Sequence, residues 1–254
     1  MPVTTTVEGD RATVTIDRPE RKNSLPPSVL QRIGDEIEEV AGDVRAVVVT
    51  GVGDVFSSGA DVDEFMARTD DPEAVVDYLG HFGALYDRIE SAPVPVVARV
   101  NGPAYGGGYE LVMACDLRVA ADTAELCPAE INMGLIPPFE RLRANLSEAR
   151  VRELCFTGDT LDAREAADAG VYNEVVSPED LDAATDDLVE RVVSTSPNAV
   201  AQTKRAMVDS ARGGGVDVDT YRSALDVQCA GHPDFEESVT AFTEGRSPDY
   251  DHEG

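Results

Sequence analysis

Three consecutive glycines, Gly106, Gly107 and Gly108, lie between a predicted buried strand at residues 94–100 and a predicted short helix at residues 109–114. Glycine has no side chain, so the backbone N–H groups of such a turn can approach a ligand closely. The start of the following helix adds further N–H groups and the positive end of the helix dipole, which both favour an anion. The segment can therefore form an oxyanion hole, in which backbone donors stabilise an oxygen that becomes negative in a transition state. A tight turn or close helix packing would use the same glycines.

A second glycine-rich segment, residues 49–62, includes the end of another predicted buried strand at residues 44–50. Gly51 and Gly53 match the first two glycines of the dinucleotide-binding pattern G-x-G-x-x-G. The third glycine would stand at position 56, where the chain has Phe56. The pattern therefore fails, and a dinucleotide site is not expected here.

The elements that must position these segments follow from the apolar periodicity. Alternating apolar and polar residues, or short apolar runs, predict strands, and apolar residues spaced three and four apart predict helices. Strands are predicted at residues 3–8, 11–16, 44–50, 94–100, 117–120 and 172–176. Helices are predicted at residues 28–41, 72–91, 109–114, 162–169, 178–195, 198–211, 217–230 and 233–244, with a loop or hinge at Gly213, Gly214 and Gly215. Strands separated by helices indicate an α/β protein with β-β-α units and a mainly helical last third.

Five segments resemble motifs of the crotonase family, also called the enoyl-CoA hydratase/isomerase family. They are Arg18-Pro19 with Asn23-Ser24-Leu25, residues 56–62 (FSSGADV), residues 101–110 (NGPAYGGGYE) with Cys115-Asp116-Leu117, residues 128–137 (PAEINMGLIP), and residues 156–159 (FTGD) with 163–170. The resemblance covers essentially the whole chain. It implies an α/β fold, namely a crotonase-like spiral of β-β-α units with a helical C-terminal section. Residues 1–195 would form the core with a CoA-thioester site, and residues 196–254 a helical trimerisation section.

The resemblance also implies roles for four residues at the reacting centre. The backbone N–H groups of Ala60 and Gly107 would bind the thioester oxygen, which becomes negative in the transition state. Glu110 and Glu130 match the two catalytic glutamates of the hydratases. Two close carboxyls titrate as a coupled pair, so one of them is protonated more easily and can serve as the acid. Without the resemblance, Glu110 would be explained by the helix dipole and Glu130 as a solvated loop carboxylate.

CoA would arrive as part of the substrate, and no metal or redox cofactor is expected. The residues implied in CoA binding are Ser58, Asp61, Arg21, Lys22 and Gly106. Asp63 and Glu64 stand where some relatives have a lysine, so Arg18, Arg21, Lys22 and Arg246 are the remaining candidates for pairing with the CoA phosphates. Arg21 and Lys22 could equally be solvated loop charges.

The expected reaction is the syn-addition of water to a trans-2-enoyl-CoA, giving a 3-hydroxyacyl-CoA. A double-bond isomerase needs only one principal glutamate and is the first alternative; a decarboxylase or a thioester hydrolase fits the same frame. A non-catalytic acyl-CoA binding protein is the alternative of another class. After Pro138 the chain lacks about three residues of a glycine-rich turn that many family members have. This turn borders the acyl pocket, so the shortening bears on the placement of Glu130 and on substrate preference.

The chain is strongly acidic, with 49 Asp and Glu against 21 Lys and Arg, a net charge of −28. Such a surface repels nucleic acids and anionic lipids, so neither is expected as a partner. The four cysteines, Cys115, Cys127, Cys155 and Cys229, show no metal or redox spacing and are predicted to be small buried apolar residues. No signal peptide and no membrane span is recognisable, which predicts a cytoplasmic protein.

The charge also predicts a halophilic protein, although an ordinary acidic protein has the same composition. Like charges repel one another in the compact state, and 1 M salt shortens the Debye length to about 3 Å. The melting temperature is therefore expected to rise steadily from low to molar KCl. A melting temperature that stays constant or falls over this series contradicts the halophilic interpretation.

Overall fold

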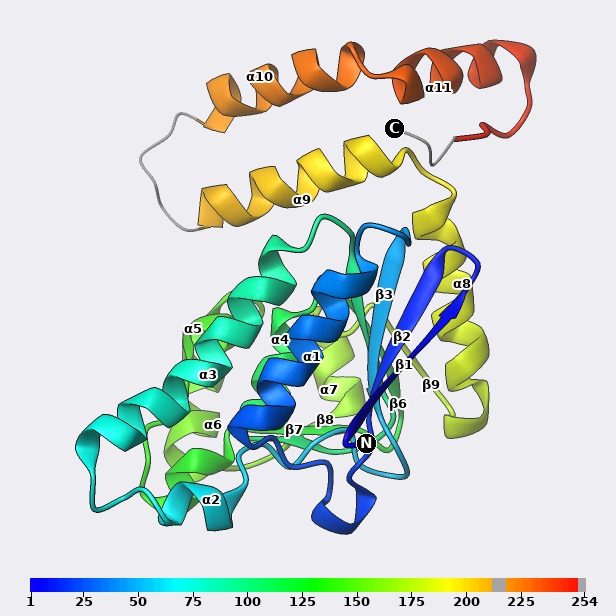
Figure 1. Cartoon of the computed structure of the whole chain (residues 1–254). Coiled ribbons are helices and arrows are strands. Elements are labelled where there is room, and N and C mark those ends of the chain that lie inside the picture. The colour runs from blue at the N-terminus through cyan, green and yellow to red at the C-terminus, as the bar shows by residue number, and fades with distance from the viewer. Residues whose placement is uncertain (212–217, 251–254) are drawn as a thin grey trace.

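The computed structural model describes residues 1–211 and 218–250; the predicted loop at Gly213, Gly214 and Gly215 lies outside them (Figure 1). A six-stranded sheet in the order β1-β2-β3-β4-β6-β9 forms the centre of the molecule. Its strands are β1 (Val3–Glu8), β2 (Arg11–Ile16), β3 (Ala46–Gly51), β4 (Val96–Val100), β6 (Leu117–Ala121) and β9 (Glu174–Val176). The first two strands form the predicted antiparallel hairpin, and every later neighbour pairs in parallel.

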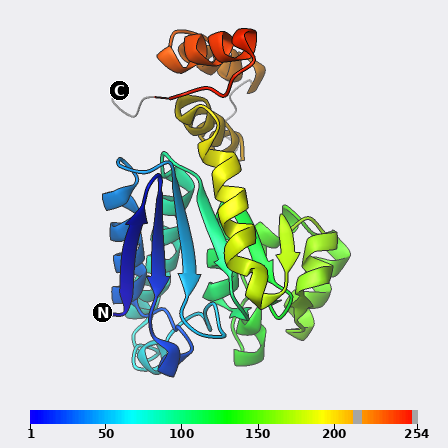
Figure 2. The same cartoon turned by 90° about the vertical axis from the view of Figure 1, so that its right-hand side faces the viewer.

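Both faces of this sheet are covered, which explains its continuous apolar strands. In β3, Val47 and Val49 pack in the main core with α1 (Pro27–Val40) and α3 (Pro72–Ser91). Ala46 and Val48 point the other way and pack against α8 (Leu181–Val193). Figure 2 shows α8 on the face of the sheet opposite to α1 and α3.

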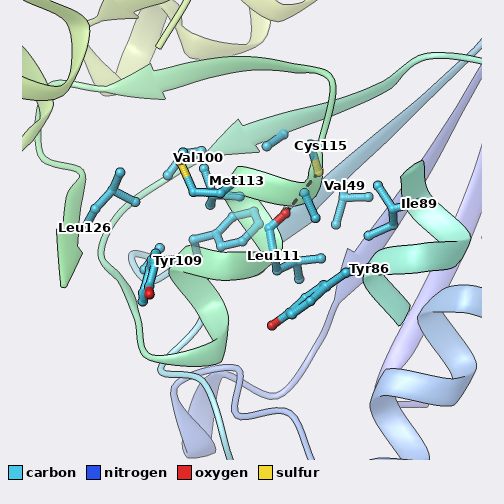
Figure 3. Close-up of a cluster of buried hydrophobic side chains, with 14 of the residues drawn as sticks. Val49, Tyr86, Ile89, Val100, Tyr109, Leu111, Met113, Cys115 and Leu126 are labelled. Carbon is cyan, nitrogen blue, oxygen red and sulfur yellow. Dashed lines mark hydrogen bonds between the residues drawn. The ribbon is translucent and has the colours of Figure 1, made fainter. Parts of the chain in front are cut away.

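The helix that follows the glycines lies inside the main core. This helix, α4 (Gly107–Ala114), is buried at every position. Figure 3 shows Leu111 and Met113 of α4 in one cluster with Tyr86 and Ile89 of α3 and with Val49. The glycine turn is therefore held on a rigid, buried element.

A small second sheet joins β5 (Ala104–Tyr105), β7 (Glu125–Cys127) and β8 (Leu161–Asp162). The chain runs from β4 in the large sheet to β5 in the small one and then into α4, and it repeats the step with β6 and β7. This is the β-β-α spiral that the resemblance implied, so the fold class is confirmed. The strands of the small sheet are two or three residues long, which is why no periodicity predicted them.

The remaining helices cover the edges of the core. They are α2 (Val62–Met66), α5 (Glu140–Arg143), α6 (Glu148–Thr157) and α7 (Ala163–Asp168), with short 3₁₀ turns η1 (Pro19–Arg21), η2 (Ala129–Met133) and η3 (Pro178–Asp180). The predicted helix at 178–195 begins as η3 and continues as α8. The predicted helix at 109–114 begins two residues earlier, at Gly107, because the glycines form its first turn.

The C-terminal helices α9 (Pro197–Ala211), α10 (Val218–Ala230) and α11 (Pro233–Glu244) lie beyond one end of the sheet (Figure 1). The buried side chain of Lys204 fixes α9 to the core. Its ammonium donates to the carbonyls of Ile89 and Val94 at 2.8 and 3.0 Å and pairs with Asp116 at 2.7 Å. Within the described residues, no helix is both long and apolar enough to cross a membrane.

Candidate active site

Two backbone segments run side by side where the small sheet begins. Ser57 and Ala104 form a parallel bridge, and the N–H of Tyr105 donates to the carbonyl of Ser57 at 2.9 Å. Both segments run in the same direction, so the third residue beyond each bridge partner arrives at the same place. These residues are Ala60 and Gly107, the two predicted oxyanion donors.

The contacts of the neighbouring glycine show how closely the two segments approach. Gly59 has a φ of +81°, and a Cβ built on it would lie 2.8 Å from the nitrogen of Gly107. Among the described residues, the N–H groups of Ala60 and Gly107 donate to no acceptor. A Cβ at Gly107 would collide with the ring of Phe82. Two unused donors next to each other can bind one oxygen of a ligand.

Gly106 was predicted to contribute to CoA binding, but its contacts give it a different role. Its N–H donates to the carbonyl of Cys127 at 2.9 Å, so this N–H is not available to CoA. Its φ is +53°, and a Cβ built there would lie 3.1 Å from Oε1 of Glu130. The missing side chain at Gly106 therefore lets the carboxyl of Glu130 pack against the glycine turn.

Both predicted catalytic carboxyls lie in this region, and burial raises the pKa of each to about 7. Glu110, in the first turn of α4, is 9% exposed. Beyond burial, Arg141 lowers the pKa of Glu110, whereas the charge of Glu130 raises it. Oε2 of Glu130 is buried and has no hydrogen-bond partner in the described part of the chain.

Two carboxyls with a pKa near 7 can exchange protons at neutral pH. One of them is then a carboxylate that accepts a proton, while the other is an acid that donates one. The two N–H donors next to them can stabilise a negative oxygen in the same step. The arrangement therefore fits acid–base chemistry on a carbonyl compound.

Of the predicted CoA-binding residues, Ser58 and Lys22 lie together, because the N–H of Ser58 donates to the carbonyl of Lys22 at 2.9 Å. The exposed ammonium of Lys22 forms no ion pair within the described ranges. Arg21 is exposed as well, but it pairs with Asp63 at 2.8 Å. Lys22 is thus the better candidate for a phosphate contact.

Asp61 does not face a ligand as predicted, because its carboxylate is buried among protein donors. It accepts hydrogen bonds from the hydroxyl of Ser24 at 2.9 Å, the guanidinium of Arg18 at 3.2 Å and the N–H of Glu64 at 3.4 Å. Burial alone would raise the pKa of Asp61, but the bonds from Ser24 and Glu64 lower it. Asp61 therefore holds the segment that carries Ala60, and Arg18 is engaged there rather than with CoA.

Arg246, another candidate for a CoA phosphate, is also engaged. Its guanidinium pairs with Glu237 at 2.6 Å and with Glu244 at 2.8 Å. No group of three His, Cys, Asp or Glu side chains in the described residues could hold a metal ion. A reaction without metal or redox cofactor stays a prediction.

The sequence reasoning missed two residues at the site, Tyr86 and Arg141. The hydroxyl of Tyr86 donates to the carbonyl of Gly107 at 2.8 Å. Nη1 of Arg141 lies 3.7 Å from Oε1 of Glu110. Tyr86 belongs to the buried face of a correctly predicted helix, and Arg141 is a cation directly after the shortened turn. The pattern along the chain does not show what either side chain contacts. The sequence alone could therefore place Tyr86 only in the core and Arg141 only on the surface.

The model of the enoyl-CoA hydratase/isomerase family matches residues 8–253 of the chain. The chain therefore belongs to this family. The chain is 34% identical to the short-chain-enoyl-CoA hydratase of Clostridium acetobutylicum over 94% of this chain and 93% of the relative. It is also 34% identical to the crotonyl-CoA hydratase of Syntrophomonas wolfei over 94% of each chain. The solved structure of an enoyl-CoA hydratase from Bacillus anthracis is similar with a TM-score of 0.93, at 27% identity and over 100% of both chains.

The unpaired carboxyl of Glu130 leads to a prediction about stability. Its pKa of about 7 in the folded protein lies above the ordinary 4.5, so the folded state binds more protons between these pH values. Wild-type stability therefore falls as the pH rises through this window, and Glu130→Gln should remove the part of this fall that is due to Glu130 and keep the part due to Glu110. At pH 8.5 the variant is expected to be more stable by up to about 3 kcal/mol, and at pH 5 the two should be nearly equal.

Urea unfolding of both proteins over this pH range measures the difference. The exposed Glu39 is the matched control, since Glu39→Gln should change stability little at either pH. A Glu130→Gln difference that does not grow between pH 5 and pH 8.5 would contradict the raised pKa of Glu130.

Proposed function

We propose that this protein is an enoyl-CoA hydratase that adds water to a trans-2-enoyl-CoA and forms a 3-hydroxyacyl-CoA. The observation that carries the proposal is the placement of two buried carboxyls, Glu110 and Glu130, beside the unused N–H groups of Ala60 and Gly107. An isomerase needs one principal carboxyl, whereas hydration uses a base and an acid at once. The family membership and the names of the two relatives support the same reaction.

The proposed reaction uses each part of the site. The thioester oxygen accepts hydrogen bonds from the N–H groups of Ala60 and Gly107. One glutamate takes a proton from water, whose oxygen forms a bond to C3 of the substrate. The electron pair of the C2–C3 double bond moves toward the thioester, and the negative oxygen that develops is stabilised by the two donors. The other glutamate gives its proton to C2, which completes the product.

The pKa values of Glu110 and Glu130 agree with one glutamate acting as the base and the other as the acid. With both values near 7, loss of one proton from the pair makes loss of the second harder, because the two charges repel each other. The pair therefore favours the state with one carboxylate and one acid, which is the state that hydration consumes. Proton transfer by positioned groups of this kind accelerates a reaction by about 10²–10⁴.

Binding of CoA is proposed to use the side of the site that carries Ser58 and Lys22. The ammonium of Lys22 is exposed and would pair with a phosphate of the CoA portion. We further propose that the enzyme acts in the cytoplasm; the free state of all four cysteines agrees with a reducing compartment. Three of the four are buried, as the sequence predicted, and Cys229 is half-buried.

The first functional prediction concerns crotonyl-CoA, a short substrate that matches the names of both relatives. The wild-type protein is expected to hydrate crotonyl-CoA, seen as loss of the enoyl-thioester absorbance in concentrated KCl. Glu110→Gln keeps the size of the side chain but removes its acid–base function, so turnover should fall about 10²-fold or more. Glu39→Gln is the control and should keep full activity.

Different outcomes of this assay separate the alternatives. Conversion of a 3-enoyl-CoA but not of crotonyl-CoA would identify an isomerase. Persistent absorbance together with measured binding of crotonyl-CoA would support the non-catalytic binding protein. Undiminished activity of Glu110→Gln would refute the role of Glu110.

We also propose that the helices α9–α11 form the interface of a homotrimer, two of which would stack into a hexamer. The support is a set of large apolar side chains in this section that the single chain leaves exposed. They are Met207 (68%), Val227 (73%), Phe235 (51%), Val239 (49%) and Phe242 (88%). Another copy of the same chain can bury such residues by mutual contact.

Light scattering coupled to size-exclusion chromatography tests the assembly. A trimer of the 27.1 kDa chain, or a dimer of trimers, is expected. Phe242→Asp should shift the protein toward smaller species, because it puts a charge into the apolar interface. Phe156→Asp is the matched control, since Phe156 is 75% exposed but lies on α6, outside this section. A monomeric wild-type protein would refute the proposed assembly.

A further inference from the structure

Arg141 stands directly after the shortened turn, in the short helix α5. The hydroxyl of the fully buried Tyr109 donates to the carbonyl of Pro138 and ties the turn to α4. This bond fixes the chain three residues before Arg141. The guanidinium of Arg141 reaches the site from this helix, and 28% of its side chain remains exposed.

Three groups hold the guanidinium in place. Its Nη2 lies 2.6 Å from Oε1 of Glu90 on α3. Its centre lies 4.9 Å from the middle of the Tyr86 ring, close enough for a cation–π contact. Its Nη1 lies 3.7 Å from Oε1 of Glu110. Glu90 and Tyr86 therefore anchor a positive charge against one member of the glutamate pair.

The other member of the pair has no such partner. Among the described residues, Glu130 forms no ion pair, and its Oε2 is buried without a hydrogen bond. The Nε of Arg141 is likewise buried and unpartnered. An opposite charge within about 4–6 Å favours the ionised form of a carboxyl. The cation therefore favours ionised Glu110 and leaves the proton on Glu130.

We propose that Arg141 is a positioning residue that keeps Glu110 ionised, so that the charge of the pair lies on Glu110 and its proton on Glu130. The proposal rests on the proposed function, because it decides which glutamate accepts a proton from water. Of the other groups facing Glu110, the charges of Glu130 and Glu140 disfavour its ionised form, as burial does, whereas the hydroxyl of Tyr86 favours it. Tyr86 faces it from α3 with a hydroxyl whose pKa burial raises well above its usual value, so it stays neutral. Arg141 is thus the cation that opposes these effects.

The kinetic test compares Arg141→Gln, Arg141→Met and Arg141→Lys with the wild type. An arginine this close lowers a carboxyl pKa by about 1–3 units, so its loss should move the acidic limb of kcat/KM upward by that amount. At pH 7 the Gln and Met variants should then lose about tenfold or more in kcat/KM, and their activity relative to the wild type should recover as the pH rises. Arg141→Lys retains the charge and should keep the limb near its wild-type position.

Arg143→Gln is the matched control. Arg143 lies on the same short helix and pairs with the exposed Glu148 at 2.8 Å, so its loss should leave the pH profile unchanged. A loss of activity in Arg141→Gln and Arg141→Met that is equal at all pH values would show a structural role and overturn the proposal. Full activity of both variants at pH 7 would overturn it as well.

A second readout does not depend on turnover. Infrared titration of protein labelled with ¹³C at the glutamate carboxyls follows the carboxylic acid band, and Glu110→Gln assigns the contribution of Glu110. In Arg141→Met this contribution should titrate about 1–3 pH units higher than in the wild type. An unshifted titration refutes the role of Arg141 even if the protein hydrates crotonyl-CoA. A shifted titration in a protein that converts no enoyl-CoA would instead reject the proposed function and retain the electrostatic role.

Discussion

The parallel alignment of residues 57–60 with residues 104–107 is the constraint on which the rest of the site depends. It places the N–H groups of Ala60 and Gly107 next to each other, and it works only if the two backbones nearly touch. A Cβ at Gly108 would collide with the carbonyl of Ser57, and one at Gly59 would lie 2.8 Å from the nitrogen of Gly107. The glycines are therefore needed first for close packing, and the unused donors follow from that packing.

Several features of the site reduce the stability of the folded protein. Glu110 and Glu130 are carboxyls in surroundings that disfavour their charge, and the two N–H donors have no acceptor in the described chain. Each unsatisfied buried polar group disfavours folding. The sheet compensates, because it is buried on both faces by α1, α3 and α4 on one side and by α8 on the other. Because α4 lies wholly in the core, this packing can hold the site in shape.

Sequence reasoning succeeded where the signal was local. The glycine turn, the long helix at Pro72–Ser91 and the β-β-α order were all predictable from spacing and resemblance. Sequence reasoning failed where the role of a side chain depends on a contact with a residue far away in the sequence. Asp61 was predicted to contact CoA, but it is bound by Arg18 and Ser24, residues some forty positions away. Arg141 meets Glu90 and Glu110 only after folding, so no pattern along the chain could assign its task.

The turn after Pro138 was predicted to be about three residues shorter than in many family members, and its contacts bear on what such a turn would do. A turn that lacks about three residues would be expected to leave Glu110 and Glu130 less well enclosed. In this structure the hydroxyl of Tyr109 donates a hydrogen bond to the carbonyl of Pro138, and α5 begins two residues later, at Glu140. The guanidinium of Arg141 on this helix lies 3.7 Å from Glu110. In a chain with a net charge of −28, a cation held beside one of two buried glutamates distinguishes them, because burial is the largest cause that raises the pKa of each, whereas Arg141 lowers the pKa of Glu110.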